Sequence, residues 1–286
     1  MEYLLLGITA VAVAVQNIFK KRYNKKSAGG TFFFSGLISL TAMLFFIVIN
    51  RDWSYRAELL LPSAGFALCY AAATVFGVLA IRYGSLAKTG LITSCSLLLP
   101  SFFGIIVFKE AVTPTLVIGT LFLVAALVMI NYRKEEGEKK KDSLRWWIFV
   151  ILSFIGNGGC SIVQNAERRI YGDEGKNMFM IVALFMVVAI MMICTLCMRE
   201  ERTLILNTLK YGWHWSILSG LANGLTNYLV LLLTPLINAS VMFPVISGGG
   251  LVVVFLYSVF VEKEKFTLLQ KIGFLIGIAS IVLLNL

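Results

Sequence analysis

The sequence predicts an all-α integral membrane protein with ten transmembrane helices, built as two inverted five-helix repeats. The first reason is composition: of 286 residues, 59% are hydrophobic and 14% are charged, with a mean hydropathy of +0.87. That is more apolar surface than one soluble core could bury. The second is that apolar segments of about 20 residues, long enough to cross a bilayer, recur throughout the chain. The third is that sequence motifs of the first half return in the second.

Each predicted span is a run of predominantly apolar residues, because a helix rises about 1.5 Å per residue through a hydrocarbon core roughly 30 Å thick. In chain order the spans cover residues 3–19, 31–50, 61–81, 87–107, 115–132, 145–166, 177–198, 213–236, 239–261 and 268–286. The connections are short and leave no room for a soluble catalytic domain. The first span lacks a basic leading region and a small-residue cleavage site, which indicates a retained helix rather than a signal peptide.

The clearest duplication is the tripeptide Val-Gln-Asn, at residues 15–17 and again at 163–165. Each copy lies near the end of an apolar segment. Each is followed in the same frame by a basic pair and a tyrosine, Lys20-Lys21 and Tyr23 or Arg168-Arg169 and Tyr171. A polar amide pair in a membrane helix is costly, so its return at matching places indicates a duplicated membrane unit.

A second duplication joins the ends of the two halves. It aligns Lys109-Glu110 with Lys263-Glu264, Thr113 with Thr267, Gly119 with Gly273 and Asn131 with Asn285. Five helices are an odd number, so the second copy must cross the membrane in the opposite sense. We therefore predict a first repeat over 1–132, a charged linker over 133–144 and a second repeat over 145–286. Inverted repeats place a substrate site near the bilayer midplane, where the halves meet.

Polar side chains inside the spans are the candidate substrate ligands, because in hydrocarbon such groups must face another helix or a water-filled cavity. The candidates are Gln16, Tyr70, Thr74, Thr93, Ser94, Asn157, Ser161, Gln164, Asn223, Asn227, Tyr228 and Ser247. Asn157, Ser161 and Gln164 share one helical face and form a polar stripe. A Ser or Thr can instead bond its own helix, and the amides can instead hold helices together. Gly248 to Gly250 either permit close packing or line the cavity in a locally opened helix.

Carboxylates are absent from the middle of every predicted span, and those nearest the membrane, Glu110, Glu167 and Glu264, lie at helix ends. A strongly cationic substrate would then lack a paired carboxylate, so the amides, hydroxyls and tyrosines favour a neutral or zwitterionic solute. Cation–π contacts with Tyr70 or Tyr228 keep a quaternary amine as an alternative. The two Lys-Glu pairs are expected as interfacial anchors and ion pairs rather than as ligands.

The remaining residue types indicate no cofactor and no metal. The five cysteines fall inside predicted spans and are expected to be apolar packing residues. The single histidine, His214, lies between Trp213 and Trp215 at the start of a span, as interfacial aromatic clusters do. The net charge of +10 is confined to loops and helix ends, which membrane topology explains without a nucleic-acid partner.

The paired ending of the two halves resembles that of the drug/metabolite transporter superfamily, specifically its ten-helix EamA-like members. The matching residues are Pro100 to Val107 with Lys109-Glu110, Thr113 and Gly119, echoed by Gly248-Gly249-Gly250 to Val261 with Lys263-Glu264, Thr267 and Gly273. The resemblance covers the whole chain. It implies transport of amino acids, other metabolites, nucleotide sugars, choline or toxic organic compounds, and does not choose among them.

The predicted function is secondary transport of a small polar or zwitterionic metabolite by alternating access, in the direction of export. The expected setting is the plasma membrane, specifically a bacterial inner membrane, with a monomer or homodimer. Alternatives are a transporter of quaternary amines, organic cations or drugs, and a structural or sensory membrane protein without flux. An enzyme acting on lipid-linked substrates would need clustered acids, bases or metal ligands. The loops rich in Lys and Arg place both termini outside, whereas the resemblance implies cytoplasmic termini.

Overall fold

The computed structural model describes residues 2–26, 30–53, 56–83, 89, 92–93, 95–131, 143–263 and 266–284, and these contain helices and no strand. Seven stretches are long and apolar enough to cross a membrane. They contain α1 (Glu2–Lys26), α2 (Thr31–Ile49), α3 (Leu60–Tyr83), α7 (Leu144–Tyr171), α8 (Lys176–Cys197), α11 (Trp213–Leu233) and α12 (Ala239–Phe260). An all-helical membrane protein, as expected from the composition, is therefore consistent with the structure.

Three further apolar helices are shorter: α5 (Leu98–Val107), α6 (Pro114–Asn131) and α13 (Leu268–Leu284). They fall on the predicted spans 87–107, 115–132 and 268–286. In the first of these spans α5 begins at Leu98, after the short 3₁₀ turn η2 (Cys95–Leu97), and Thr89, Ile92 and Thr93 before it are also helical. The other residues of 87–94 lie outside those that the structure describes, so the length of this span stays a prediction. Pro100 lies in the first turn of α5, where the missing N–H of proline costs no helical hydrogen bond. The count of ten full spans stays a prediction.

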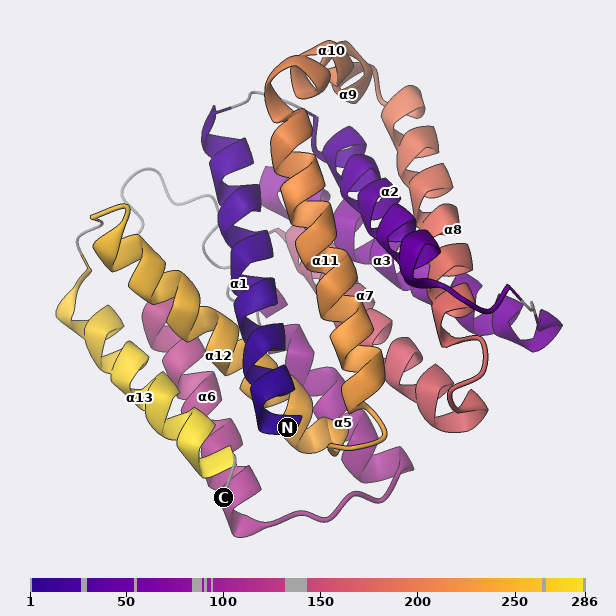
Figure 1. Ribbon diagram of the computed structural model, residues 1–286. Helices are drawn as coiled ribbons and strands as arrows, with labels where there is room; N and C mark the ends of the chain where they lie inside the picture. The colour runs from indigo at the N-terminus through magenta and orange to yellow at the C-terminus, as the bar shows by residue number, and fades with distance from the viewer. Residues whose placement is uncertain are drawn as a thin grey trace.

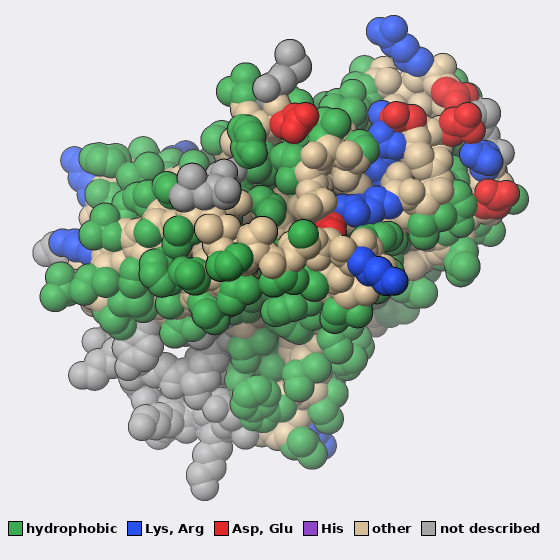
Figure 2. Space-filling model, turned by 90° about the horizontal axis from the view of Figure 1, so that it is seen from below, with side chains coloured by type: hydrophobic (Ala, Val, Ile, Leu, Met, Phe, Trp, Pro, Cys, Tyr) green, Lys and Arg blue, Asp and Glu red, His purple; other side chains and the backbone are tan. Residues whose placement is uncertain are grey.

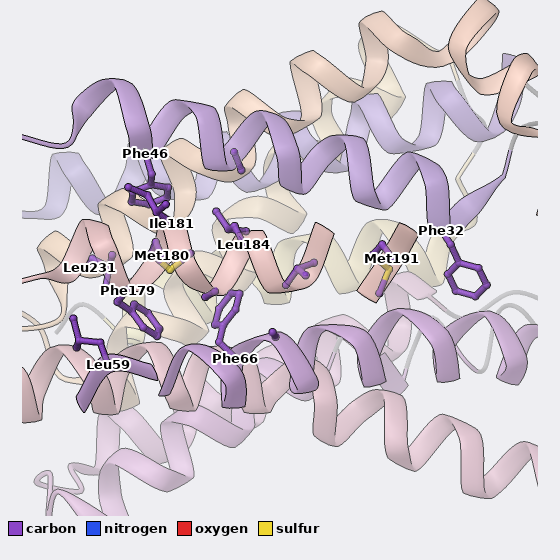
Figure 3. Packing of buried hydrophobic residues seen from close by; sticks show 14 residues of the cluster. Phe32, Phe46, Leu59, Phe66, Phe179, Met180, Ile181, Leu184, Met191 and Leu231 are labelled. Carbon is purple, nitrogen blue, oxygen red and sulfur yellow. The ribbon is translucent and has the colours of Figure 1, made fainter. Parts of the chain in front are cut away.

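The largest buried core lies where α8 packs against α2 and α3. Figure 3 shows Phe46 close to Ile181 at one end of the α2–α8 contact and Phe32 close to Met191 at the other. The start of α2 therefore faces the end of α8, so these two helices run antiparallel. Phe66 of α3 meets Phe179 of α8 edge to face, with ring centroids 6.1 Å apart.

Helices α6 and α13 pack along each other in Figure 1 and are also antiparallel. A Cβ added at Gly119 of α6 would lie 2.8 Å from the Leu284 side chain of α13. A Cβ added at Gly273 of α13 would lie 3.1 Å from Ile130 of α6. The two aligned glycines thus make the same kind of close contact, each at the far end of the other helix.

The loops before α6 and α13 also share an unusual backbone conformation. Lys109 and Lys263 have φ values of 52° and 53°, and among the described residues they are the non-glycine residues with positive φ. Few side chains tolerate that region, so its use at two aligned lysines indicates that the duplication extends to local structure. Glu264, the partner of Glu110 in the alignment, lies outside the described residues.

Both termini lie at the same end of the helix bundle (Figure 1). Figure 2 looks onto that end, where Lys, Arg, Asp and Glu side chains gather on one part and hydrophobic side chains cover most of the rest. The opposite end carries the short segments α9 (Arg199–Thr203), α10 (Ile205–Asn207) and η3 (Thr208–Gly212). There Glu201 of α9 accepts hydrogen bonds from the backbone N–H groups of Thr31 and Phe32 and so caps α2.

Candidate functional site

Helix α7 carries the polar stripe, and its position is set by close packing on α3. A Cβ at Gly156 would lie 2.5 Å from the Ala73 nitrogen and 2.7 Å from the Cys69 oxygen, so only glycine allows this approach. One turn earlier the Ser153 hydroxyl donates to the Ala73 carbonyl at 2.8 Å. Ser153 lies one turn before Asn157 on the same helical face, so the contact with α3 adjoins the stripe of Asn157, Ser161 and Gln164.

Asn157 ties α7 to the segment that leads into α5. Its Nδ2 donates to the Ser96 hydroxyl at 2.6 Å and approaches the Thr93 carbonyl at 3.5 Å. The Ser96 hydroxyl in turn donates to the Thr93 carbonyl at 2.6 Å. Two of the predicted ligands, Asn157 and Thr93, are therefore in one network, which the first half and the second half share.

Gln164 ties α7 to α11. Its Nε2 donates to the Asn227 carbonyl at 2.9 Å, and Gln164 is only 3% exposed. The Asn227 amide donates back to Asn223, to its carbonyl at 2.9 Å and to its side-chain oxygen at 3.1 Å. Three predicted ligands from two helices thus form one hydrogen-bonded group, in which Asn223 and Asn227 are half-buried.

Tyr228 lies beside this amide group and lines a cavity of about 570 Å³. Its ring meets Phe45 and Phe46 of α2 edge to face, at 6.3 and 6.4 Å between centroids. The cavity lining includes the end of α2 and the start of α8, with Arg51, Asp52, Asp173, Lys176 and Asn177 among its residues. That volume is within the range of small-molecule sites.

The charges of this cavity have both signs and are held in place. Asp173 accepts hydrogen bonds from Lys176 and Arg168, each at 2.6 Å. These bonds, led by that from Lys176, lower the pKa of Asp173 below its ordinary value, so the carboxylate stays ionised. Asn177 adds an amide oxygen that is shielded from water and has no partner among the described residues. The lining can therefore meet a ligand that carries a positive and a negative group.

Several predicted ligands are not joined to these networks. Tyr70 stacks on Phe66, with ring centroids 6.4 Å apart. Thr93 is joined through its carbonyl, and its hydroxyl bonds the Thr89 carbonyl of its own segment at 2.9 Å. Thr74, Ser161 and Ser247 are half-buried, and Gln16 is buried on α1. Ser94 lies outside the described residues.

The glycines Gly248 to Gly250 pack and do not open their helix. Helix α12 runs unbroken from Ala239 to Phe260. A Cβ at Gly249 would lie 2.8 Å from the Ala10 side chain of α1, and one at Gly248 would lie 3.1 Å from Ile281 of α13. The alternative of a locally opened helix at these residues is therefore wrong, because neighbouring helices occupy that space.

Buried carboxylates are the feature that sequence reasoning missed. Glu110, Glu167 and Glu201 are all buried, although the first two end apolar segments and were expected at the membrane interface. Glu167 is 1% exposed, and neither of its carboxyl oxygens has a hydrogen-bond partner among the described residues. Glu110 accepts a hydrogen bond from Arg169 at 2.5 Å, which confirms its prediction as an ion-pairing residue. The sequence shows where each glutamate lies along its helix, but it does not show which distant segment covers that end of the helix and buries the side chain.

The comparisons with known proteins establish the fold alone. No protein-family model matches this chain, and the comparison with curated proteins finds no match. The chain is similar to a solved structure described only as the crystal structure of a protein, with a TM-score of 0.76. The two sequences are 13% identical, and the similarity covers 99% of this chain and 95% of the other. The whole helical arrangement is thus shared with a solved protein, and activity is not part of that likeness.

Proposed function

We propose that this protein is a secondary transporter of a small zwitterionic or polar metabolite, working by alternating access in a plasma membrane. The observation that carries the proposal is the amide group of Gln164, Asn223 and Asn227, which joins α7 to α11 beside the cavity at Tyr228. Amide groups placed between membrane helices are costly unless they bond each other or a polar solute. We also propose that the protein is an EamA-like member of the drug/metabolite transporter superfamily and that it exports its substrate.

The proposal includes two inverted repeats of five helices. Support comes from the antiparallel packing of α6 on α13, in which the aligned Gly119 and Gly273 make matching contacts. The matching left-handed backbone at Lys109 and Lys263 adds to it. In transporters with inverted repeats the substrate site lies where the halves meet, and α7 contacts the segment before α5 through Asn157 and Ser96.

The zwitterionic class follows from the mixed charge of the cavity. Lys176 or Arg51 can meet a carboxylate, and Asp173 can meet an ammonium group. The amides of Asn50 and Asn177 in the lining can bond either end of such a solute without a net charge of their own. An amino acid or a compound of similar size fits within about 570 Å³.

The test begins with a melting screen of the purified protein against amino acids, nucleosides, polyamines and quaternary amines. A ligand at 100 times its Kd stabilises a protein by about 2.7 kcal/mol, which a melting curve detects. The hit is then measured as radiolabelled uptake into proteoliposomes, with protein-free liposomes as control. We expect a zwitterion to raise the melting temperature and to enter the liposomes. Binding without saturable uptake would instead favour a sensory protein.

Transport of an organic cation is the second candidate, and Glu167 favours it. Its buried carboxyl group has no partner among the described residues, so an ionised carboxylate at this position would require a counter-ion. A substrate cation could supply that counter-ion. The two candidates separate in the variant Glu167→Gln, which keeps the shape and removes the charge. If quaternary amines stabilise the parent and not Glu167→Gln, the cation candidate stands. If a zwitterion stabilises both equally, it falls.

A further inference from the structure

Helix α12 is tied at each of its ends by an ion pair to a different helix. At its start, Glu110 accepts hydrogen bonds from the N–H groups of Ala239 and Ser240 at 2.9 and 2.8 Å and bonds Arg169 of α7 at 2.5 Å. The Arg169 guanidinium also lies over the Phe108 ring, 4.6 Å from its centroid. One carboxylate thus joins the segment after α5, the start of α12 and the end of α7. We name this set the Glu110 latch.

At the other end of α12, Lys21 of α1 forms the corresponding contact. Its Nζ lies 2.8 Å from a carboxylate oxygen of Glu262 and 3.4 Å from the Ser258 hydroxyl. The neighbouring Arg22 donates through Nε to the Tyr257 hydroxyl at 2.8 Å. We name the Lys21–Glu262 pair the Lys21 latch. Helix α12 has 22 residues, so the two latches are separated by about 33 Å, close to the thickness of a hydrocarbon core.

The basic residues of the two latches are equivalent in the duplicated motif, whereas Glu262 lies two residues before Glu264, the aligned partner of Glu110. Lys21 and Arg169 are the second basic residues after the two Val-Gln-Asn tripeptides. Each binds an acidic residue that follows the fourth apolar segment of the opposite half, Glu262 for Lys21 and Glu110 for Arg169. Each ion pair therefore crosses between the halves, and one lies at each end of the bundle.

We propose that the two latches are alternating gates: in transport, one opens the site to one side of the membrane while the other stays closed. This inference rests on the proposed alternating access. In the structure both are closed, which is the arrangement of an occluded state. The Lys21 latch is the weaker one, since its side chains are 33% and 11% exposed, against 22% and 2% for Arg169 and Glu110. An exposed ion pair gains less free energy than a buried one with additional hydrogen bonds.

The test measures from which side the site can be reached, and it requires no known substrate. A single cysteine is placed on the α7 stripe by Ser161→Cys, after the five native cysteines are replaced by alanine. Its alkylation rate by a membrane-impermeant maleimide is measured in intact cells and in inside-out vesicles. The latch variants are Lys21→Glu, Glu262→Lys, their double exchange, and Arg169→Gln. Arg56→Gln is the matched control, because Arg56 belongs to the exposed ion pair with Glu174 at 3.0 Å.

We expect Lys21→Glu and Glu262→Lys each to raise alkylation from the side on which Lys21 lies by at least about fivefold. The double exchange restores the opposite charges and should return the rate to that of the parent. Arg169→Gln should raise alkylation from the other side, and Arg56→Gln should change neither rate. The gate proposal would be overturned if the single variants were alkylated equally from both sides. It would also be overturned if the double exchange kept the alkylation rate of the single variants.

The two proposals fail separately. Side-specific labelling without uptake of any ligand would end the transport proposal and leave two opposed latches in place. If uptake is saturable and no latch variant changes the labelling rate, the gate proposal is rejected and the transport proposal stands.

Discussion

Helices α1 and α7 carry the two copies of the Val-Gln-Asn motif, yet their polar side chains form different contacts. On α7, Ser153, Asn157 and Gln164 each donate to another segment of the protein. On α1, Thr9 donates to the Leu5 carbonyl of its own helix at 2.7 Å. Val13, at the position that aligns with Ser161, is apolar and packs beside Gly250 of α12, where an added Cβ would lie 3.4 Å from its side chain. The Val-Gln-Asn frame is therefore present twice, while the hydrogen bonds from the polar stripe to other segments belong to the second copy.

Packing differs between the two helices in the same way. Helix α7 brings its own glycine, Gly156, against the backbone of α3, whereas a Cβ at Gly7 of α1 would meet nothing within 4 Å. The close approach of α1 to α12 depends instead on Gly249 and Gly250 of α12. Helix α7 thus approaches a neighbouring backbone through its own glycine, whereas α1 depends on glycines of its neighbour α12.

The largest effect in this comparison is expected from Gly156→Val. The added side chain would overlap the backbone atoms of Ala73 and Cys69, which cannot move aside as a flexible side chain could. We expect a loss of roughly 3 kcal/mol in the free energy of unfolding. The measurement is the melting temperature in detergent, with Gly7→Val as control. If both variants melt alike, α7 is not packed more tightly than α1.

The second largest effect is expected from Gln164→Ala. It removes the hydrogen bond that joins Gln164 of α7 to the Asn227 carbonyl of α11, so ligand affinity should fall about tenfold, or about 1.4 kcal/mol. The matched variant is Gln16→Ala on α1, for which we expect less than half of that effect. Isothermal titration with the ligand from the melting screen gives both values. Equal losses would show that the two copies share recognition evenly.

A smaller effect is expected where one hydrogen bond between helices is removed. Ser153→Ala breaks the bond to the Ala73 carbonyl and should destabilise the protein by about 0.6 kcal/mol, the average for such bonds in a membrane. Thr9→Val removes a bond within α1 and should leave the melting temperature nearly unchanged, since the Leu5 carbonyl keeps its helical partner. A larger fall in melting temperature for Thr9→Val than for Ser153→Ala would contradict the claim that only Ser153 stabilises a contact between helices.

The helices and the repeated motif were predictable from the sequence because they depend on local patterns. The Val-Gln-Asn motif and the aligned Gly119 and Gly273 identified the duplication, and apolar length predicted the helices. The stripe of Asn157, Ser161 and Gln164 was also predictable, since helical spacing alone places these residues on one face.

The partners across the fold were not predictable. Glu110 caps α12, whose start is more than a hundred residues further along the chain, and Glu201 caps α2 in the other half. Glu167 ends an apolar segment, which ordinarily means an exposed side chain, and only the folded structure shows it to be buried. Sequence patterns give the direction of a side chain on its helix, whereas capping and burial depend on which distant segment packs there.

The smallest effect concerns the loop between α7 and α8. Hydrogen bonds from Lys176 and Arg168 lower the pKa of Asp173, so its contribution to stability is present above the ordinary Asp value of about 4. The contribution is lost as the pH falls through the lowered value. Asp173→Asn should therefore melt slightly below the parent at about pH 7, and the gap should close on acidification. A gap that is constant with pH would show that the ionised form is not favoured.

The most direct test of the central claim is uptake by Asn157→Ala and Asn227→Ala in proteoliposomes. Both residues belong to networks around α7, and we expect each variant to be inserted normally and to lose saturable uptake of the zwitterion from the melting screen. Asn207→Ala, an exposed asparagine of α10, should transport like the parent. Parental uptake by both network variants would contradict the placement of the substrate site on α7 and α11.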